Sequence, residues 1–285
     1  SGTYVPLRMS PLIIISTVLT HAFGGSAGRE GAALQLGGSL GGTIGKWLKL
    51  DEYDQKVMIM CGMSAAFSAL FGTPLTATIF AMEVVSIGIM EYAALVPCAI
   101  ASLIAREMAN MVGAHAEQFP VPASVTLDIK SGALIVLLAL LCAAVSILFC
   151  EVLHRTERLF KFRMKNPWVR VVVGALLVIV LAKVLGTTDY LGAGMNIVER
   201  AIHGETEPAA FLLKIIFTAI TLSCGFKGGE IVPTLFVGAT FGCLFGQVTG
   251  LSPSLTAACG MAAVFCGVTN SPISSLLIHA WIAIR

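Results

Sequence analysis

Charged side chains are scarce in this chain of 285 residues, and their scarcity decides its broad class. Only 12% of the residues are Asp, Glu, Lys or Arg, whereas 56% are hydrophobic, and the mean hydropathy is +0.89. Soluble globular domains carry about 25% charged residues. The composition therefore excludes an ordinary soluble domain and predicts a polytopic membrane protein, for which we expect an all-α fold.

Sequence patterns that hold metals, cofactors or nucleic acids are missing. The eight cysteines are scattered through apolar runs, without a Cys-x-x-Cys pair, and the five histidines have no ligand spacing. We therefore expect no metal, no cofactor and no disulfide. The basic residues do not gather on an amphipathic face, so no nucleic-acid partner is expected either.

Signatures of the enzymes that such a chain could be are also missing. An intramembrane protease would need a Gly-x-Ser-Gly or a Gly-x-Gly-Asp motif, and neither occurs. A phosphate-binding P-loop fails because Trp47 follows Gly45 and Lys46, and Leu40 stands where the first glycine should be. We expect no enzyme. A membrane scaffold that transports nothing remains an alternative from another class.

Apolar segments predict the helices, since about 20 residues make one crossing. Several segments are too short to cross alone and are interrupted by Gly or Pro, as broken helices are. The chain begins without a Met and ends soon after its last apolar segment begins, so we expect it to be part of a longer protein. The predicted segments are 10–25, 32–48, 56–71, 74–90, 92–112, 130–153, 168–186, 208–224, 233–249, 254–267 and 272–284.

Clustered positive charge orients the chain in its membrane. Between His154 and Arg170 there are five further Lys or Arg residues, opposed only by Glu157. The positive-inside rule predicts that this loop is cytoplasmic and that the loops 113–128 and 186–207 are outside. We expect a multi-pass protein of a cell membrane, in bacteria the inner one.

Two glycine-rich segments each place a carboxylic acid at the start of an apolar helix. They are residues 28–33, GREGAA, and residues 228–233, GGEIVP. A helix that starts inside a membrane directs free N–H groups and a positive dipole at whatever precedes it. Two such starts that face each other would bind an anion near the bilayer midplane. We therefore predict an anion transporter in which Glu30 and Glu230 compete with the anion or donate to it.

An internal repeat relates the two ends of the chain. The sequence CGMSAAF at 61–67 recurs as CGMAAVF at 259–265, and Pro74 corresponds to Pro272 at the same offset. We predict two membrane halves, residues 1–112, truncated at the N-terminus, and residues 113–285, truncated at the C-terminus. If an odd number of crossings separates equivalent elements, the halves are inverted and their broken helices converge.

These motifs resemble the CLC family of chloride channels and transporters over nearly the whole chain. Residues 27–38, AGREGAALQLGG, are similar to the family's GREGP region, and residues 228–233, GGEIVP, lie where it has GxFxP. The resemblance implies an inverted repeat of two helical halves with broken, tilted helices, and a homodimer with one pore per subunit.

Three departures from the family pattern favour its fluoride/proton antiporter branch. Ala32 replaces the proline after GREG, Glu230 and Ile231 replace an apolar-Phe pair, and Val84 stands where chloride/proton exchangers have an inner proton-transfer glutamate. Fluoride is a strong hydrogen-bond acceptor, and a protonated Glu230 would add a donor to the backbone N–H groups. The alternative within the family is a chloride/proton antiporter or a chloride channel.

The resemblance also implies the roles of individual residues. Glu30 is the expected gate and proton-coupling residue, and Glu230 the selectivity residue and proton donor. Both acids could instead only cap their helices, and Glu83 could equally be a solvated helix end or part of a proton path. The backbone N–H groups expected to bind the anion are those of Arg29, Glu30, Gly31, Ile231 and Val232.

Overall fold

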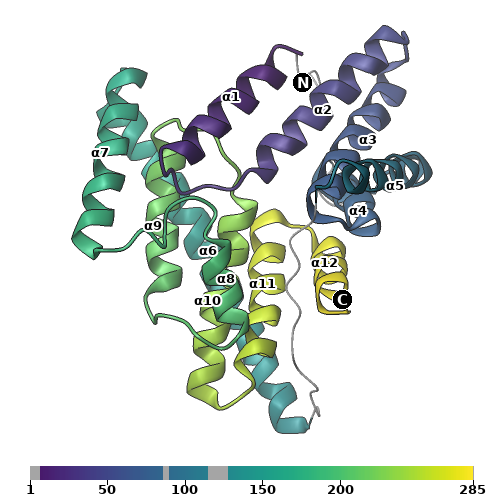
Figure 1. Ribbon diagram of the computed structural model, residues 1–285. Helices are drawn as coiled ribbons and strands as arrows, with labels where there is room; N and C mark the ends of the chain where they lie inside the picture. Colours follow the sequence, from purple (N-terminus) through teal and green to yellow (C-terminus); the bar gives the residue numbers. More distant parts are fainter. Residues whose placement is uncertain (1–6, 86–89, 115–127, 285) are drawn as a thin grey trace. The chain divides into compact units, whose positions relative to one another are not determined.

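The computed structural model describes residues 7–85, 90–114 and 128–284 (Figure 1). Across this part of the chain, the secondary structure consists of twelve α-helices, one 3-10 turn and one isolated β-bridge. This confirms the predicted all-α class. The helices are α1 Met9–Ala22, α2 Glu30–Trp47, α3 Glu52–Phe71, α4 Pro74–Val85, α5 Leu95–Met111, α6 Ile129–Arg163, α7 Pro167–Leu185, α8 Met195–Ile202, α9 Ala210–Ser223, α10 Ile231–Thr249, α11 Pro253–Thr269 and α12 Pro272–Ile284, with the 3-10 turn at Tyr92–Ala94.

The predicted apolar segments coincide with the observed helices. Among the described residues, four helical stretches are long and apolar enough to cross a bilayer. Shorter apolar helices also match predicted segments. They are too short to cross a bilayer alone, as the halves of broken helices are. The expected outer loop at 113–128 lies almost entirely outside the described residues. The four long stretches are Tyr92–Met111, Ile129–Arg163, Pro167–Leu185 and Ile231–Thr249.

Helix α6 continues well beyond its predicted end at residue 153. Ion pairs one turn apart join Glu151 to Arg155 at 2.5 Å and Glu157 to Lys161 at 2.6 Å, and such pairs stabilise exposed helix. The basic stretch that we predicted as a loop is therefore helical as far as Arg163. The expectation of a long loop there was wrong, because charge alone does not distinguish a loop from a solvated helix.

Aspartate and asparagine side chains cap the N-termini of α6 and α7. Asn166 accepts a hydrogen bond from the Trp168 N–H at 3.0 Å, and Pro167 takes the first position of α7. Asp128 accepts from the Ser131 N–H at 2.8 Å. Hydrogen bonds from the Ser131 side chain and backbone lower the pKa of the Asp128 carboxyl. Local sequence therefore accounts for where α6 and α7 begin.

The chain forms two compact units, and each combines segments that are distant in sequence. The first unit contains the described parts of 1–16, 30–118 and 270–285, and the second those of 17–29 and 119–269. In the first unit, α3, α4 and α5 enclose a core around Met60 and Cys98. In the second unit, the core around Phe149 joins α6 to α9, α10 and α11.

Close helix contacts at glycine repeat in the two units. In the first unit, a Cβ atom added to Gly37 of α2 would overlap the carbonyl oxygen of Gly62 in α3. In the second unit, a Cβ added to Gly238 of α10 would overlap the carbonyl oxygen of Gly260 in α11. Helices α2 and α3 and their repeat counterparts α10 and α11 therefore cross in the same way, with their backbones in direct contact at glycine.

We expect Gly37→Ala to destabilise the protein by about 1–3 kcal/mol, because the new methyl group has no space against Gly62. Thermal unfolding in detergent, followed by the loss of monodisperse protein, measures the change. Gly132→Ala in α6 is the matched control, since a Cβ there meets no atom within 4 Å and alanine favours helix. Equal melting temperatures for Gly37→Ala and wild type would contradict the expectation.

Candidate functional site

The two glycine-rich segments pair directly inside the second unit. The Gly28 N–H donates to the Gly229 carbonyl at 2.7 Å, and the Gly229 N–H donates to the Gly28 carbonyl at 2.6 Å. A Cβ atom on Gly228 would overlap the Ala27 side chain, so glycine is required for this approach. The residues that precede Arg29 and Glu230 in the chain are thus hydrogen-bonded partners.

Hydroxyl groups of α9 hold the segment before Gly28. The Ser26 N–H donates to the Thr221 hydroxyl at 3.1 Å, and the Ser26 hydroxyl lies 3.1 Å from that of Thr218. All three side chains are buried. A buried, hydrogen-bonded loop keeps a defined geometry, so the first glycine-rich segment is fixed to α9 as well as to Gly229.

Helix α10 begins beside this pairing and is buried along most of its length. Ile231 and Val232 are 6% and 2% exposed. The N–H groups in the first turn of any α-helix have no acceptor within the helix. Those of Ile231 and Val232 therefore have no acceptor within α10.

Glu230 occupies the N-cap position of α10 but does not act as a cap. Its side chain makes no capping hydrogen bond, and the residue is exposed. It lines a cavity of about 310 Å³ together with residues of α6, α9 and α11. A helix cap is thus not the role that this geometry favours. The other lining residues are Cys150, Leu153, His154, Glu157, Leu222, Ser223 and Val268.

Glu30 is the first residue of α2 and is 4% exposed. Gly31 beside it is half-buried, whereas Arg29 is exposed. Glu30 and Gly31 belong to the first unit, and Arg29 belongs to the second with Glu230. An acid buried at a helix start within apolar sequence is expensive unless it has a function.

Glu83 is 8% exposed, which contradicts one of its two open alternatives, the solvated helix end. In the first unit its carboxylate accepts hydrogen bonds from the N–H groups of Ile273 at 3.1 Å and Ser274 at 3.0 Å, and from the Ser274 hydroxyl at 2.5 Å. The acid of α4 therefore neutralises the positive N-terminus of α12. This gives Glu83 a structural role that its local sequence does not reveal.

We expect Glu83→Gln to destabilise the protein by about 1.5–3 kcal/mol, because a neutral amide replaces a charged acceptor of three hydrogen bonds. Thermal unfolding in detergent measures the change. Glu52→Gln is the control, since Glu52 also lies in the first turn of a helix but is exposed. If both variants melt at the wild-type temperature, the carboxylate of Glu83 does not hold α12.

Lys214 is a buried charge that our sequence analysis missed. It is fully buried in α9, and its Nζ donates to the carbonyls of Gly192 at 2.8 Å and Tyr190 at 3.3 Å. The same atom lies 5.0 Å from the centre of the Phe236 ring. Lys214 therefore fixes the segment after α7 against α9 and α10. The sequence feature that could have identified it is a lone lysine inside an apolar run.

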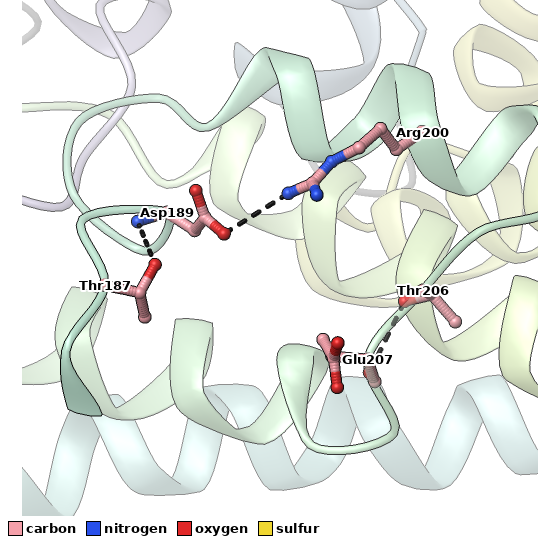
Figure 2. A network of polar contacts seen from close by, with 5 residues as sticks. All are labelled: Thr187, Asp189, Arg200, Thr206 and Glu207. Atoms are coloured by element: carbon pink, nitrogen blue, oxygen red, sulfur yellow. Dashed lines mark hydrogen bonds and ion pairs between the residues drawn. The ribbon is translucent and has the colours of Figure 1, made fainter.

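A polar pocket lies in the segment that we expect outside the membrane, and Figure 2 shows its contacts. Arg200 pairs with Asp189 at 3.2 Å, and the Asp189 N–H donates to the Thr187 hydroxyl at 3.1 Å. Burial, and secondarily the Asp189 charge, raise the pKa of Tyr190, which also lines the pocket. None of the predicted anion-site residues lines it.

Comparisons with known proteins identify the relatives of this chain. A family model described as voltage gated chloride channel matches residues 1–281. A "chloride/fluoride channel protein" of Pseudomonas syringae pv. tomato is 33% identical over 280 residues, which cover 96% of this chain and 62% of the relative. The chain thus spans less than two thirds of that relative's length.

Two solved structures have the same fold. A CLC-type fluoride/proton antiporter superposes with a TM-score of 0.93 at 35% identity, over 98% of this chain and 71% of the other. A slow cyanobacterial Cl⁻/H⁺ antiporter superposes with a TM-score of 0.81 at 18% identity, over 98% of this chain and 69% of the other. The second likeness concerns the fold alone.

Proposed function

Since the chain belongs to the voltage gated chloride channel (CLC) family, we propose that its protein exports fluoride in exchange for protons. It is a multi-pass membrane protein of helices with the fold of that family. The observation that carries the fluoride assignment is Glu230, an acid at the start of α10 that caps nothing and lines a cavity. The relatives named for fluoride support the same choice of ion.

The anion is bound by backbone N–H groups at the two helix starts. The hydrogen bonds between Gly28 and Gly229 support this proposal, because they pair the residue before Arg29 with the residue before Glu230. Positive helix ends stabilise an anion without a charged side chain. The donors are the N–H groups of Arg29, Glu30, Gly31, Ile231 and Val232.

Glu30 is the gate that couples the anion to protons. When ionised, its carboxylate occupies the place of the anion at the helix start; when protonated, it leaves this place and admits the ion. The near-complete burial of Glu30 supports this role, since an acid buried within the membrane is expensive unless it has a function. One proton is thus taken up each time the anion site opens.

Glu230 supplies the donor that selects fluoride. Its protonated carboxyl donates a hydrogen bond to the ion, and the smaller fluoride accepts more strongly than chloride. The exposure of Glu230 to a cavity supports this role, because a side chain free of capping bonds can turn toward an ion or release a proton.

A homodimer with one pore per subunit belongs to the same proposal, because the family resemblance implies it. The outward apolar side chains of α7, among them Val172, Leu176 and Ile179, are more than half exposed. They fit contact with lipid or with a second subunit. Transport needs no chemical reaction at the site, and we assign the protein no enzyme activity.

Flux measurements on the full-length protein in liposomes test the proposal. A fluoride electrode follows efflux, and a pH dye inside the vesicles follows the protons. We expect fluoride efflux that drives proton uptake, and much slower efflux of chloride. Chloride efflux as fast as that of fluoride would favour a chloride/proton antiporter or a chloride channel. No efflux of either ion would favour the scaffold.

A further inference from the structure

The cavity beside Glu230 also contains two titratable side chains of another helix. His154 and Glu157 of α6 line it together with Glu230, and Ser223 adds a hydroxyl group from the end of α9. Its volume is about 310 Å³, whereas about 10–15 Å³ of such space admits one water molecule. All of these residues belong to the second unit. Water can therefore connect the Glu230 carboxyl with the side chains of α6.

The α6 side of the cavity lies at the cytoplasmic end of a membrane crossing. Residues 131–150 carry no charge, and about 20 residues suffice to cross the bilayer. The charged part of α6 begins at Glu151 and leads into the basic stretch that the positive-inside rule places in the cytoplasm. His154 lies just beyond that boundary and is exposed.

A backbone hydrogen bond fixes which nitrogen of His154 can accept a proton. Its Nδ1 lies 2.7 Å from the carbonyl oxygen of Cys150, one turn earlier in α6. Because a carbonyl can only accept, Nδ1 carries the hydrogen in the neutral ring and Nε2 is the free acceptor. Histidine also changes its charge near neutral pH. The ring is thus prepared to take up one proton and to release it.

We propose that His154 passes protons from Glu230 to the cytoplasm through this cavity. The inference rests on the proposed exchange of fluoride for protons and names its inner proton acceptor. The Glu230 carboxylic acid gives its proton through water to Nε2 of His154, which leaves a carboxylate and an imidazolium. The imidazolium then releases the proton to cytoplasmic water, and both groups return to their starting states after Glu230 is protonated again from the pore side.

The charges around His154 fit this task. Glu157, on the same face of α6 and half-buried, stabilises the imidazolium, and it is itself paired with Lys161 at 2.6 Å. Glu151 is paired with Arg155, and Arg158 is exposed on α6. The positive charge of Arg170 in α7 attracts the Glu157 carboxylate.

The helices packed against α6 add little further charge. Within the described residues, α11 carries none, and α9 carries only Lys214, whose Nζ binds carbonyls of the segment after α7. Helix α10 contributes Glu230 at its start, preceded in the chain by the exposed Lys227. Glu230 is therefore the proton donor that faces His154 across the cavity.

His154→Gln tests the proposal in the full-length protein, because glutamine keeps a donor for the Cys150 carbonyl but cannot carry the proton. We expect proton-coupled fluoride efflux to slow about tenfold, less than the hundredfold or more of a general base in a dry site, since water partly replaces it. His203→Gln is the matched control. His203 is exposed, and its Nδ1 lies 2.8 Å from the Glu199 carbonyl one turn earlier, but it does not line the cavity.

Imidazole separates a proton carrier from a structural residue. In His154→Ala, added imidazole should restore most of the lost rate, because its neutral form crosses the bilayer and reaches the cavity from the cytoplasmic side. A His154→Gln rate equal to wild type, or a slow His154→Ala variant that added imidazole does not accelerate, would overturn the proposal. If wild type itself exchanges no fluoride for protons, the proposed function fails; if only the His154 result fails, the proton leaves Glu230 by another route.

Discussion

Glu30→Gln should abolish proton movement coupled to fluoride. Glutamine has nearly the shape of glutamate, but it cannot release a proton, so it never becomes the carboxylate that closes the site in exchange for the ion. Glu30 is buried at the first residue of α2, and a buried acid in a membrane protein is costly unless it has a function. The measurement is the pH inside liposomes that contain the full-length variant, recorded while a fluoride gradient is discharged.

The matched control for this prediction is Glu52→Gln. It makes the same chemical change in the first turn of α3, where the side chain is exposed, and coupling should stay at the wild-type level. If Glu30→Gln still drives protons against their gradient when fluoride flows, Glu30 is not the coupling residue. Loss of coupling in both variants would point to a general effect of charge on assembly.

The sequence predicted the helices well because apolar length and Gly or Pro interruptions are local signals. Its two failures have local causes too. Helix α8, Met195–Ile202, was missed because it has only eight residues, and the charged Glu199 and Arg200 directly follow its buried Ile197 and Val198, so that it forms no apolar segment. Helix α6 exceeds its predicted end because ion pairs one turn apart support helix in charged sequence.

Contacts between distant segments could not be predicted in the same way. Glu83 reaches Ser274 across 191 residues of the chain, and nothing near Glu83 in the sequence indicates a helix N-terminus as its partner. Lys214 likewise depends on two carbonyl groups of a separate segment. Burial of a charge can be predicted from an apolar neighbourhood, but the group that compensates it is set by the tertiary fold.

The candidate site is predictable in part. Two acids at glycine-rich helix starts are visible in the sequence, and the structure pairs Gly28 with Gly229 beside them. The cavity that joins Glu230 to α6 is not visible, because His154 precedes Glu230 by a long stretch of chain and has no metal-ligand or catalytic spacing. The direction in which the Glu230 side chain leaves the helix start decides which groups it can exchange protons with.

Glu230→Ile should lower the preference for fluoride over chloride. Isoleucine restores the apolar character of ordinary family members at this position and removes the carboxyl that donates to the ion. Loss of one charge-assisted hydrogen bond costs about 1.5–3 kcal/mol, which corresponds to about 10- to 150-fold in relative binding. The measurement is the ratio of fluoride to chloride efflux from liposomes containing the full-length protein, at equal gradients of the two ions.

Glu230→Gln is the matched control, since its amide still donates a hydrogen bond to the ion but releases no proton. We expect it to keep most of the fluoride preference while proton coupling falls, so the two variants separate donation from proton transfer. Stability should be close to wild type in both, because the Glu230 side chain makes no capping hydrogen bond and is exposed to the cavity. A fluoride preference that survives Glu230→Ile unchanged would mean that the backbone N–H groups of the two helix starts select the ion by themselves.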